Sequence, residues 1–155
     1  MHTGSAATKP PEVAQADKPR VVVMGASGYI GTNLVSELAA RGYPVRAAAR
    51  SMAVLAARGW EGVELAQADV LEMTAIEAAL AGQDVAFYLV HCMRAGDDFD
   101  DVERRGAQNF AAAAARAGIK RIVYLGGLIP RDADSRHLVS RRVTGEILRA
   151  GTVPV

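Results

Sequence analysis

The chain has 155 residues, a formal net charge of +1 at pH 7, and a composition that is 50% hydrophobic and 23% charged. This length fits one globular domain with a buried core, and the near-neutral charge gives no electrostatic reason to expect nucleic acid as a partner. No stretch approaches the roughly 20 apolar residues of a transmembrane helix. The single cysteine, Cys92, excludes an intrachain disulfide framework and a cysteine-rich zinc site, so no metal is expected. Low cysteine content fits a reducing compartment, and we expect a cytoplasmic protein.

Residues 1–18 are expected to form a disordered tail. The segment contains Pro10 and Pro11, few large apolar residues and no periodicity. It also lacks the apolar run of roughly 7–15 residues that a signal peptide requires. The predicted domain therefore comprises residues 19–155.

From residue 20 onward, short apolar runs alternate with segments of helical periodicity. In chain order, the sequence predicts strand 20–25, helix 28–41, strand 43–49, helix 51–58, strand 62–66, helix 74–80, strand 84–91, helix 97–117, strand 119–125, helix 135–150 and the start of a sixth strand at 152–155. Such alternation predicts an α/β fold, a doubly wound parallel sheet of the Rossmann type with five strands plus the start of a sixth. Ligands of these sheets bind at the carboxyl ends of the strands, near the point where the strand order reverses.

The loop after the first predicted strand carries three regularly spaced glycines. Because a strand precedes them and a helix follows, the pattern indicates a dinucleotide-binding loop. Gly25 permits a tight turn, Gly28 lets backbone N–H groups approach a pyrophosphate, and Gly31 allows the helix to pack close to the sheet. The residues of this loop that we expect to bind the cofactor are Gly25, Ser27, Gly28, Tyr29, Ile30 and Gly31.

The residues after the second predicted strand indicate which dinucleotide is bound. An NAD site usually has Asp or Glu here to bind the ribose 2′-hydroxyl, whereas this chain has Arg50 followed by Ser51. A guanidinium suits a 2′-phosphate and a serine adds a hydroxyl donor, so NADP(H) is the expected cofactor and NAD(H) is less favoured. Asp69 follows the third strand, where its carboxylate can accept a hydrogen bond from the adenine amino group. The alternatives are a surface arginine at a strand end and a turn aspartate.

These motifs resemble the short-chain dehydrogenase/reductase superfamily. Within it, they are most similar to the atypical, NmrA-like group, which includes the nucleotide-binding accessory subunit of respiratory complex I. The resemblance covers residues 20–155 and rests on VVVMGASGYIGTNLVSEL at 21–38, ADV at 68–70, VH at 90–91, RIVYLGG at 121–127 and GEILR at 145–149. It implies an NAD(P)-binding Rossmann fold in which Val70, Val90 and His91 also line the cofactor site.

The superfamily resemblance also implies an active-site tyrosine with a lysine four residues later, at the start of the helix after the fifth strand. This chain has His137 and Arg141 at that spacing instead. They are the catalytic candidates, Arg141 as a cation that contacts ribose or phosphate and His137 as a proton shuttle near neutral pH. The alternative is a helix-start histidine and a surface arginine. His91 and Cys92 alone are too few ligands for zinc.

Two functions stay open on the sequence. The missing tyrosine and lysine favour a non-catalytic NADP(H)-binding or redox-sensing module. The alternative is an NAD(P)H-dependent oxidoreductase or epimerase-like enzyme acting on a carbonyl or quinone substrate. The resemblance further implies that substrate-binding segments follow the sixth strand. We therefore expect a domain truncated at its C-terminus, or one whose sheet edge a protein partner or a second copy covers, with no nucleic acid and no membrane span.

Overall fold

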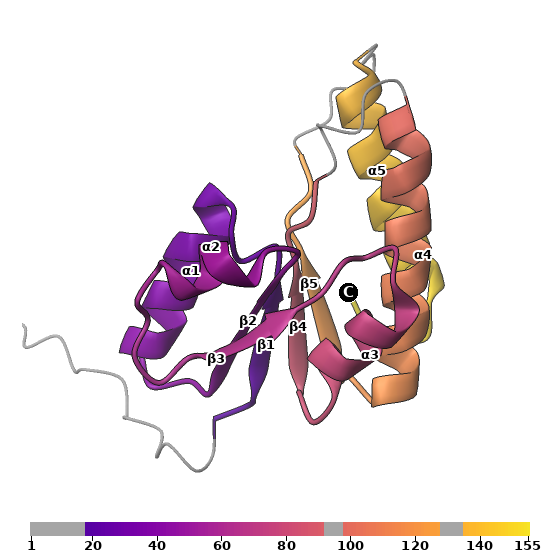
Figure 1. Ribbon diagram of the computed structural model, residues 1–155. Coiled ribbons are helices and arrows are strands. Elements are labelled where there is room, and N and C mark those ends of the chain that lie inside the picture. Colours follow the sequence, from indigo (N-terminus) through magenta and orange to yellow (C-terminus); the bar gives the residue numbers. More distant parts are fainter. Residues whose placement is uncertain (1–17, 92–97, 128–134) are drawn as a thin grey trace, which may run out of the picture.

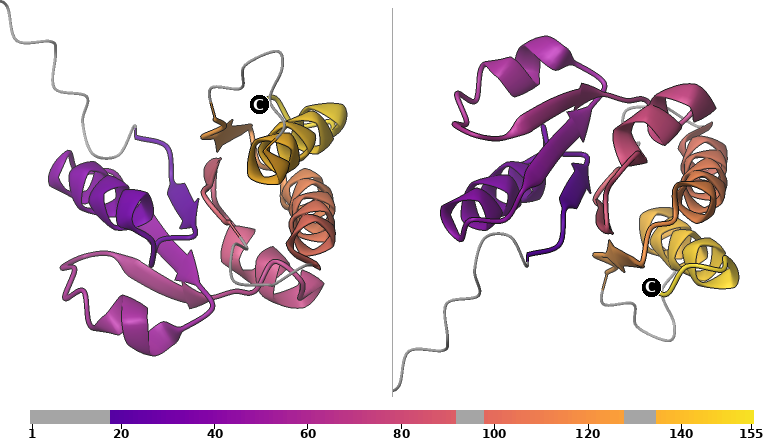
Figure 2. Two further views of the ribbon diagram at one scale, coloured as in Figure 1. Left: turned by 90° about the horizontal axis from the view of Figure 1, so that it is seen from above. Right: turned by 90° about the horizontal axis from the view of Figure 1, so that it is seen from below.

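The fold is a five-stranded parallel sheet between two layers of helices (Figures 1 and 2). The computed structural model describes residues 18–91, 98–127 and 135–155. The strands are β1 (Val21–Met24), β2 (Val45–Ala49), β3 (Glu64–Gln67), β4 (Val85–Tyr88) and β5 (Arg121–Tyr124). The helices are α1 (Tyr29–Ala40), α2 (Met52–Ala56), α3 (Met73–Leu80), α4 (Phe99–Ala117) and α5 (Arg136–Ala150).

Helices α1 and α2 cover one face of the sheet, as Figure 2 shows. Val21 and Val23 of β1 form a core on this face with Val35 of α1 and Leu55 of α2. Successive side chains of a strand point to opposite faces, so the other two residues of β1 belong to the second core.

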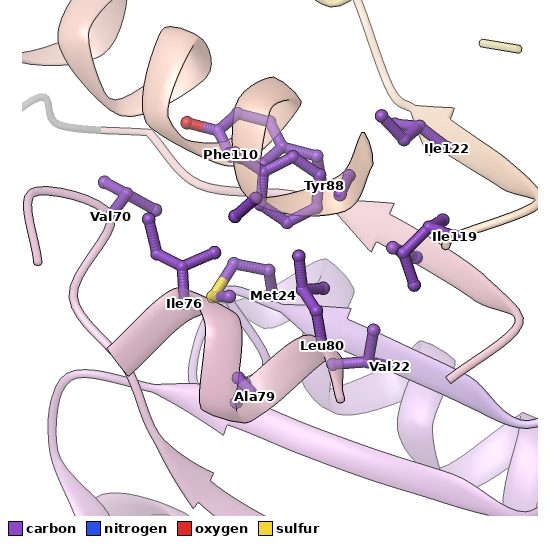
Figure 3. Close-up of a cluster of buried hydrophobic side chains, with 14 of the residues drawn as sticks. Val22, Met24, Val70, Ile76, Ala79, Leu80, Tyr88, Phe110, Ile119 and Ile122 are labelled. Atoms are coloured by element: carbon purple, nitrogen blue, oxygen red, sulfur yellow. The ribbon is translucent and has the colours of Figure 1, made fainter. Parts of the chain in front are cut away.

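Helices α3, α4 and α5 cover the second face. Val22 and Met24 of β1 lie in this core with Tyr88 of β4, and the Tyr88 ring packs against that of Phe110 on α4 with the ring centres 4.7 Å apart (Figure 3). All four residues of β1 are buried because both faces are covered. This explains why the strand is an uninterrupted apolar run in the sequence.

The strand order β3-β2-β1-β4-β5 reverses beside β1. Met24 at the end of β1 is level with Ala48 of β2 on one side and with Tyr88 of β4 on the other. The chain runs outward from β1 to β3 and then crosses back to continue from β4 to β5. This reversal places a crevice at the carboxyl ends of β1 and β4.

The predicted order of the first five strands and of the helices is confirmed, and all five strands are shorter than expected. β4 ends at Tyr88, so His91 lies in the loop beyond the sheet. The expected sixth strand is not formed by residues 152–155. Instead, the Ile122 N–H donates one hydrogen bond of 2.8 Å to the Pro154 carbonyl at the outer edge of β5. A strand ladder requires successive bonds of this kind, and a single bond leaves the segment as a loop beside β5.

The predicted tail, residues 1–18, lies outside the described residues except for Lys18. The Lys18 ammonium donates a hydrogen bond to the Arg41 carbonyl and lies 5.3 Å from the centre of the Tyr43 ring. Cys92 and the first residue of the predicted helix 97–117 also lie outside the described residues, because the description resumes at residue 98. No helix within the described ranges combines the length and the apolar composition that crossing a bilayer requires.

Candidate functional site

A cavity of about 250 Å³ lies at the carboxyl ends of β1, β2 and β4, in the crevice created by the reversal of strand order. It brings together predicted cofactor residues from loops that are far apart in the sequence. The predicted residues that line it are Gly25, Ser27, Gly28, Arg50, Asp69, Val70, Val90 and His91. The other predicted cofactor residues are not among its lining residues; they are Tyr29, Ile30, Gly31 and Ser51.

The three glycines of the first loop are not all required for the same physical reason. Gly25 has a φ of +93°, and a Cβ there would lie 2.8 Å from the Leu89 carbonyl oxygen. A Cβ on Gly31 would lie 2.3 Å from the Gly25 carbonyl oxygen, so the fold itself excludes a side chain at both positions. Gly28 has a φ of −74°, and its nearest contact would be an ordinary 3.5 Å. The fold therefore tolerates a side chain at Gly28, where a bare backbone instead leaves the end of α1 open to the cavity.

The N-terminus of α1 presents backbone donors that no helical hydrogen bond uses. The first intrahelical hydrogen bond runs from the Thr32 N–H to the Gly28 carbonyl at 2.8 Å, so the N–H groups of Tyr29, Ile30 and Gly31 have no acceptor within the helix. No side chain caps this end and its first turn has no acidic residue. The side chains of Tyr29 and Ile30 are 87% and 49% exposed, so these two residues offer the site their backbone. An uncompensated helix N-terminus of this kind favours an anion.

Two arginines lie near the glycine loop. Arg50 follows β2 and lines the same cavity, and Arg58 follows α2. Arg50 is exposed and makes no ion pair with any described residue. The Ser51 hydroxyl accepts a hydrogen bond of 3.4 Å from the Val54 N–H, so Ser51 caps α2. Arg58, which sequence reasoning missed, donates a hydrogen bond of 3.0 Å from Nη2 to the Ser27 carbonyl. Nothing in the local pattern signals this contact, because it joins residues 31 positions apart.

At the β3 end of the cavity, a turn at residues 69–71 and helix α4 hold the lining residues in place. Asp69 Oδ1 accepts a hydrogen bond of 2.9 Å from the Leu71 N–H. Asp69 is thus a turn aspartate, and it also lines the cavity. The Val70 carbonyl accepts a hydrogen bond of 3.0 Å from the Asn109 side chain. A Cβ on Gly106 would lie 2.8 Å from Val70 Cγ2, so α4 packs directly on this turn. Gly106 and Asn109 are therefore positioning residues that the sequence pattern did not reveal.

The two catalytic candidates on α5 have different surroundings. The His137 ring stacks on the ring of Phe99 with the centres 4.6 Å apart, which gives it a packing role at the start of α4. Arg141 lies beside Gly127, where a Cβ would be 3.7 Å from Arg141 Nη1. The Tyr124 hydroxyl donates a hydrogen bond of 3.0 Å to the Arg141 carbonyl.

His91 and Arg141 are electrostatic neighbours. Burial lowers the pKa of His91, the positive charge of Arg141 lowers it further, and the negative charge of Glu103 opposes both. Glu103 is a buried carboxylate of α4 that accepts a hydrogen bond from the Ser140 hydroxyl of α5. Burial also raises the pKa of Tyr124. The described part of the chain holds no cluster of three or more residues that could bind a metal ion.

The chain matches a known protein family and several curated proteins. A model of the NmrA-like family matches residues 17–138. Cinnamoyl-CoA reductase 1 of Oryza sativa subsp. japonica is 36% identical over 115 residues, which cover 70% of this chain and 34% of that protein. The chain spans about a third of the length of such relatives.

Solved structures share the fold at lower identity. Triphenylmethane reductase of Citrobacter sp., complexed with NADP(H), superposes with a TM-score of 0.76 at 21% identity, covering 86% of this chain and 46% of that one. The Bordetella bronchiseptica enzyme WbmG, in complex with NAD, gives a TM-score of 0.73 at 19% identity, covering 92% of this chain and 53% of that one. The chain thus shares the Rossmann-type arrangement of strands and helices with these structures.

Proposed function

The chain belongs to the NmrA-like family, and we propose that it is an NADP(H)-binding domain whose dinucleotide lies across the ends of β1, β2 and β4. One observation carries this proposal: the uncapped N-terminus of α1 opens through the bare Gly28 into a cavity that Arg50 also lines. The pyrophosphate would be bound by the N–H groups of the first turn. The nicotinamide dinucleotides named for the structural neighbours support the same ligand class.

The preference for NADP(H) over NAD(H) rests on charge at the end of β2. Arg50 stands where a carboxylate would bind the 2′-hydroxyl of NAD, and the Arg58 guanidinium adds a second positive charge beside Ser27. A 2′-phosphate bound here would lie near two guanidinium groups, and the residues that end β2 include no carboxylate to repel it. The structural neighbours include complexes with either cofactor, so the preference depends on these two residues of this chain.

We infer further that the domain in this form binds the cofactor without catalysing hydride transfer. His137 stacks on Phe99, and neither it nor Arg141 is among the residues that line the cavity. Neither residue is the tyrosine that transfers the proton at this place in the superfamily. The alternative is an oxidoreductase acting on a carbonyl or quinone, which the reductase names of the relatives favour.

Calorimetric titration of the full chain with NADPH and with NADH tests the binding proposal, and Gly28→Val serves as the non-binding control. We expect NADPH to bind at least tenfold more tightly than NADH, and no heat with the variant. Equal affinity for both cofactors would refute the preference, and no binding of either would refute the proposed function. Loss of absorbance at the nicotinamide band with a panel of carbonyls and quinones would show that the oxidoreductase alternative is correct.

A further inference from the structure

The glycine loop after β1 depends on one hydrogen-bond donor from a distant part of the chain. The carbonyl oxygens of residues 25–28 all accept hydrogen bonds. Three of them are bonded from within the loop or the first turn of α1, by the Gly28 N–H, the Thr32 hydroxyl and the Thr32 N–H. The Ser27 carbonyl is the exception, because its donor is Arg58 Nη2 at 3.0 Å. An anion site needs N–H groups that face the ligand and carbonyl oxygens that are engaged elsewhere, so the loop is complete only with Arg58.

The peptide unit that joins Ser27 to Gly28 is held at both edges. Its N–H, from Gly28, donates a hydrogen bond of 3.2 Å to the Gly25 carbonyl. Its carbonyl accepts the bond from Arg58 on the opposite edge, since the N–H and C=O of a trans peptide point in opposite directions. Ser27 and Gly28 both line the cavity, and a peptide that rotated there would turn its carbonyl oxygen toward the ligand. The partial negative charge of that oxygen would repel a phosphate.

Arg58 stands on a segment that is fixed to the fold. The Arg58 N–H donates a hydrogen bond of 3.1 Å to the carbonyl of Leu55, which is fully buried in the core beneath α1 and α2. Two residues further along the chain, the Trp60 indole N–H donates a hydrogen bond of 3.0 Å to the Ser36 hydroxyl of α1. The Arg58 backbone is thus fixed on both sides, and its exposed guanidinium reaches Ser27 from a fixed base.

We propose that Arg58 is a positioning residue that holds the Ser27–Gly28 peptide in the orientation that binds the pyrophosphate of either dinucleotide. This role differs from that of Arg50, because it does not require a 2′-phosphate on the ligand. The charge of Arg58 adds to the attraction of NADPH, whereas its hydrogen bond to Ser27 acts on both cofactors. The proposal rests on the proposed function, since it takes the pyrophosphate to bind at the N-terminus of α1.

NADH tests the proposal because it carries the pyrophosphate without the 2′-phosphate. Arg58→Met removes the donor and keeps most of the apolar stem. In calorimetric titrations of the full chain, we expect this variant to lose about tenfold in NADH affinity and at least as much in NADPH affinity. Arg58→Lys, which keeps a charged donor, should restore part of both. Unchanged NADH affinity in Arg58→Met would overturn the proposal, because Arg58 would then act on the 2′-phosphate alone.

Arg41→Met is the matched control. Arg41 is another exposed arginine near α1, and it pairs with Glu37 instead of contacting the loop. We expect this variant to bind both cofactors as the wild type does. An equal loss of NADH affinity in Arg41→Met and Arg58→Met would show that the affinity follows the overall positive charge, and it would refute the positioning role.

Hydrogen exchange of the Gly28 amide, followed by NMR, gives a readout that needs no cofactor. The Gly28 N–H keeps its bond to the Gly25 carbonyl while the peptide is held, so its exchange should become several-fold faster in Arg58→Met. The exchange should stay unchanged in Arg41→Met. The buried Val23 amide of β1 reports on the stability of the whole fold and should exchange at one rate in all variants. A Gly28 rate that does not change, or that rises only in step with Val23, would contradict the proposal.

The two proposals fail separately. If neither cofactor binds the wild type while Gly28 exchange still rises in Arg58→Met, the dinucleotide site is wrong and Arg58 still orders the loop. If both cofactors bind the wild type and Arg58→Met with equal affinity, only the positioning role of Arg58 is wrong.

Discussion

The two ends of the cavity are built in different ways. The β1–α1 end is made of backbone: contacts of 2.8 and 2.3 Å exclude side chains at Gly25 and Gly31, and the N–H groups of one helical turn are the donors. At the β4 end the electrostatics come from side chains: His91 lines the cavity, and the charges of Arg141 on α5 and Glu103 on α4 shift its pKa in opposite directions. A backbone site is encoded within a few consecutive residues, whereas a side-chain site depends on how distant segments pack.

Gly31→Ala should have the largest effect, because it acts on the packing of α1 against the β1 loop. The new Cβ would lie 2.3 Å from the Gly25 carbonyl oxygen, and backbone on both sides prevents relief. We expect a loss of about 3 kcal/mol in the free energy of unfolding, the upper part of the usual range for an overpacked site. Urea denaturation measures it. A variant as stable as the wild type would mean that the close packing of loop and helix is not required.

Gly28→Val tests cofactor binding at the glycine loop separately from the stability of the fold. A Cβ at this position meets nothing closer than 3.5 Å, so the stability should fall by about 1 kcal/mol or less, the size of a changed helix cap. The affinity for NADPH should fall at least a hundredfold, because the side chain stands between the helix N-terminus and the pyrophosphate. Calorimetry with NADPH, beside urea denaturation, makes the comparison. Normal binding by this variant would contradict the role of the loop.

Arg50→Ala tests whether the β2 end selects the cofactor. Loss of a charge-assisted hydrogen bond to a phosphate corresponds to roughly 1.5–3 kcal/mol, so NADPH affinity should fall by about ten- to a hundredfold while NADH affinity stays the same. Arg41→Ala, another exposed arginine that is paired with Glu37, is the control and should change neither. Equal weakening of both cofactors by Arg50→Ala would show that Arg50 acts on the loop instead of on the 2′-phosphate.

The smallest expected effect is a pH dependence from the side-chain end. The pKa of His91 in the folded protein is lowered by burial and by Arg141, with Glu103 opposing, so the unfolded chain binds the proton more readily. Stability should therefore fall as the pH decreases below about 6.5, the ordinary value for histidine. Urea midpoints at pH 7.5 and 5.5 measure the change, which His91→Gln should reduce. An unchanged pH dependence in that variant would place the source elsewhere.

The sequence by itself determined the order of strands and helices, the Rossmann-type sheet and the glycine loop. These depend on local patterns: a buried parallel strand needs a continuous apolar run, and a tight turn before a helix needs glycine at fixed positions. The same local reasoning identified Arg50 and Asp69, because the ends of parallel strands meet at one edge of the sheet.

Only the tertiary structure decided what each of these residues touches. Arg58 reaches Ser27, Gly106 admits Val70, and Glu103 meets Ser140 across distances of 31 to 37 residues in the chain. His137 and Arg141 have the spacing of one helical turn and still acquire different neighbours, Phe99 for one and Tyr124 for the other. Contacts of this kind depend on how whole helices pack on the sheet, so the periodicity of the sequence does not predict them.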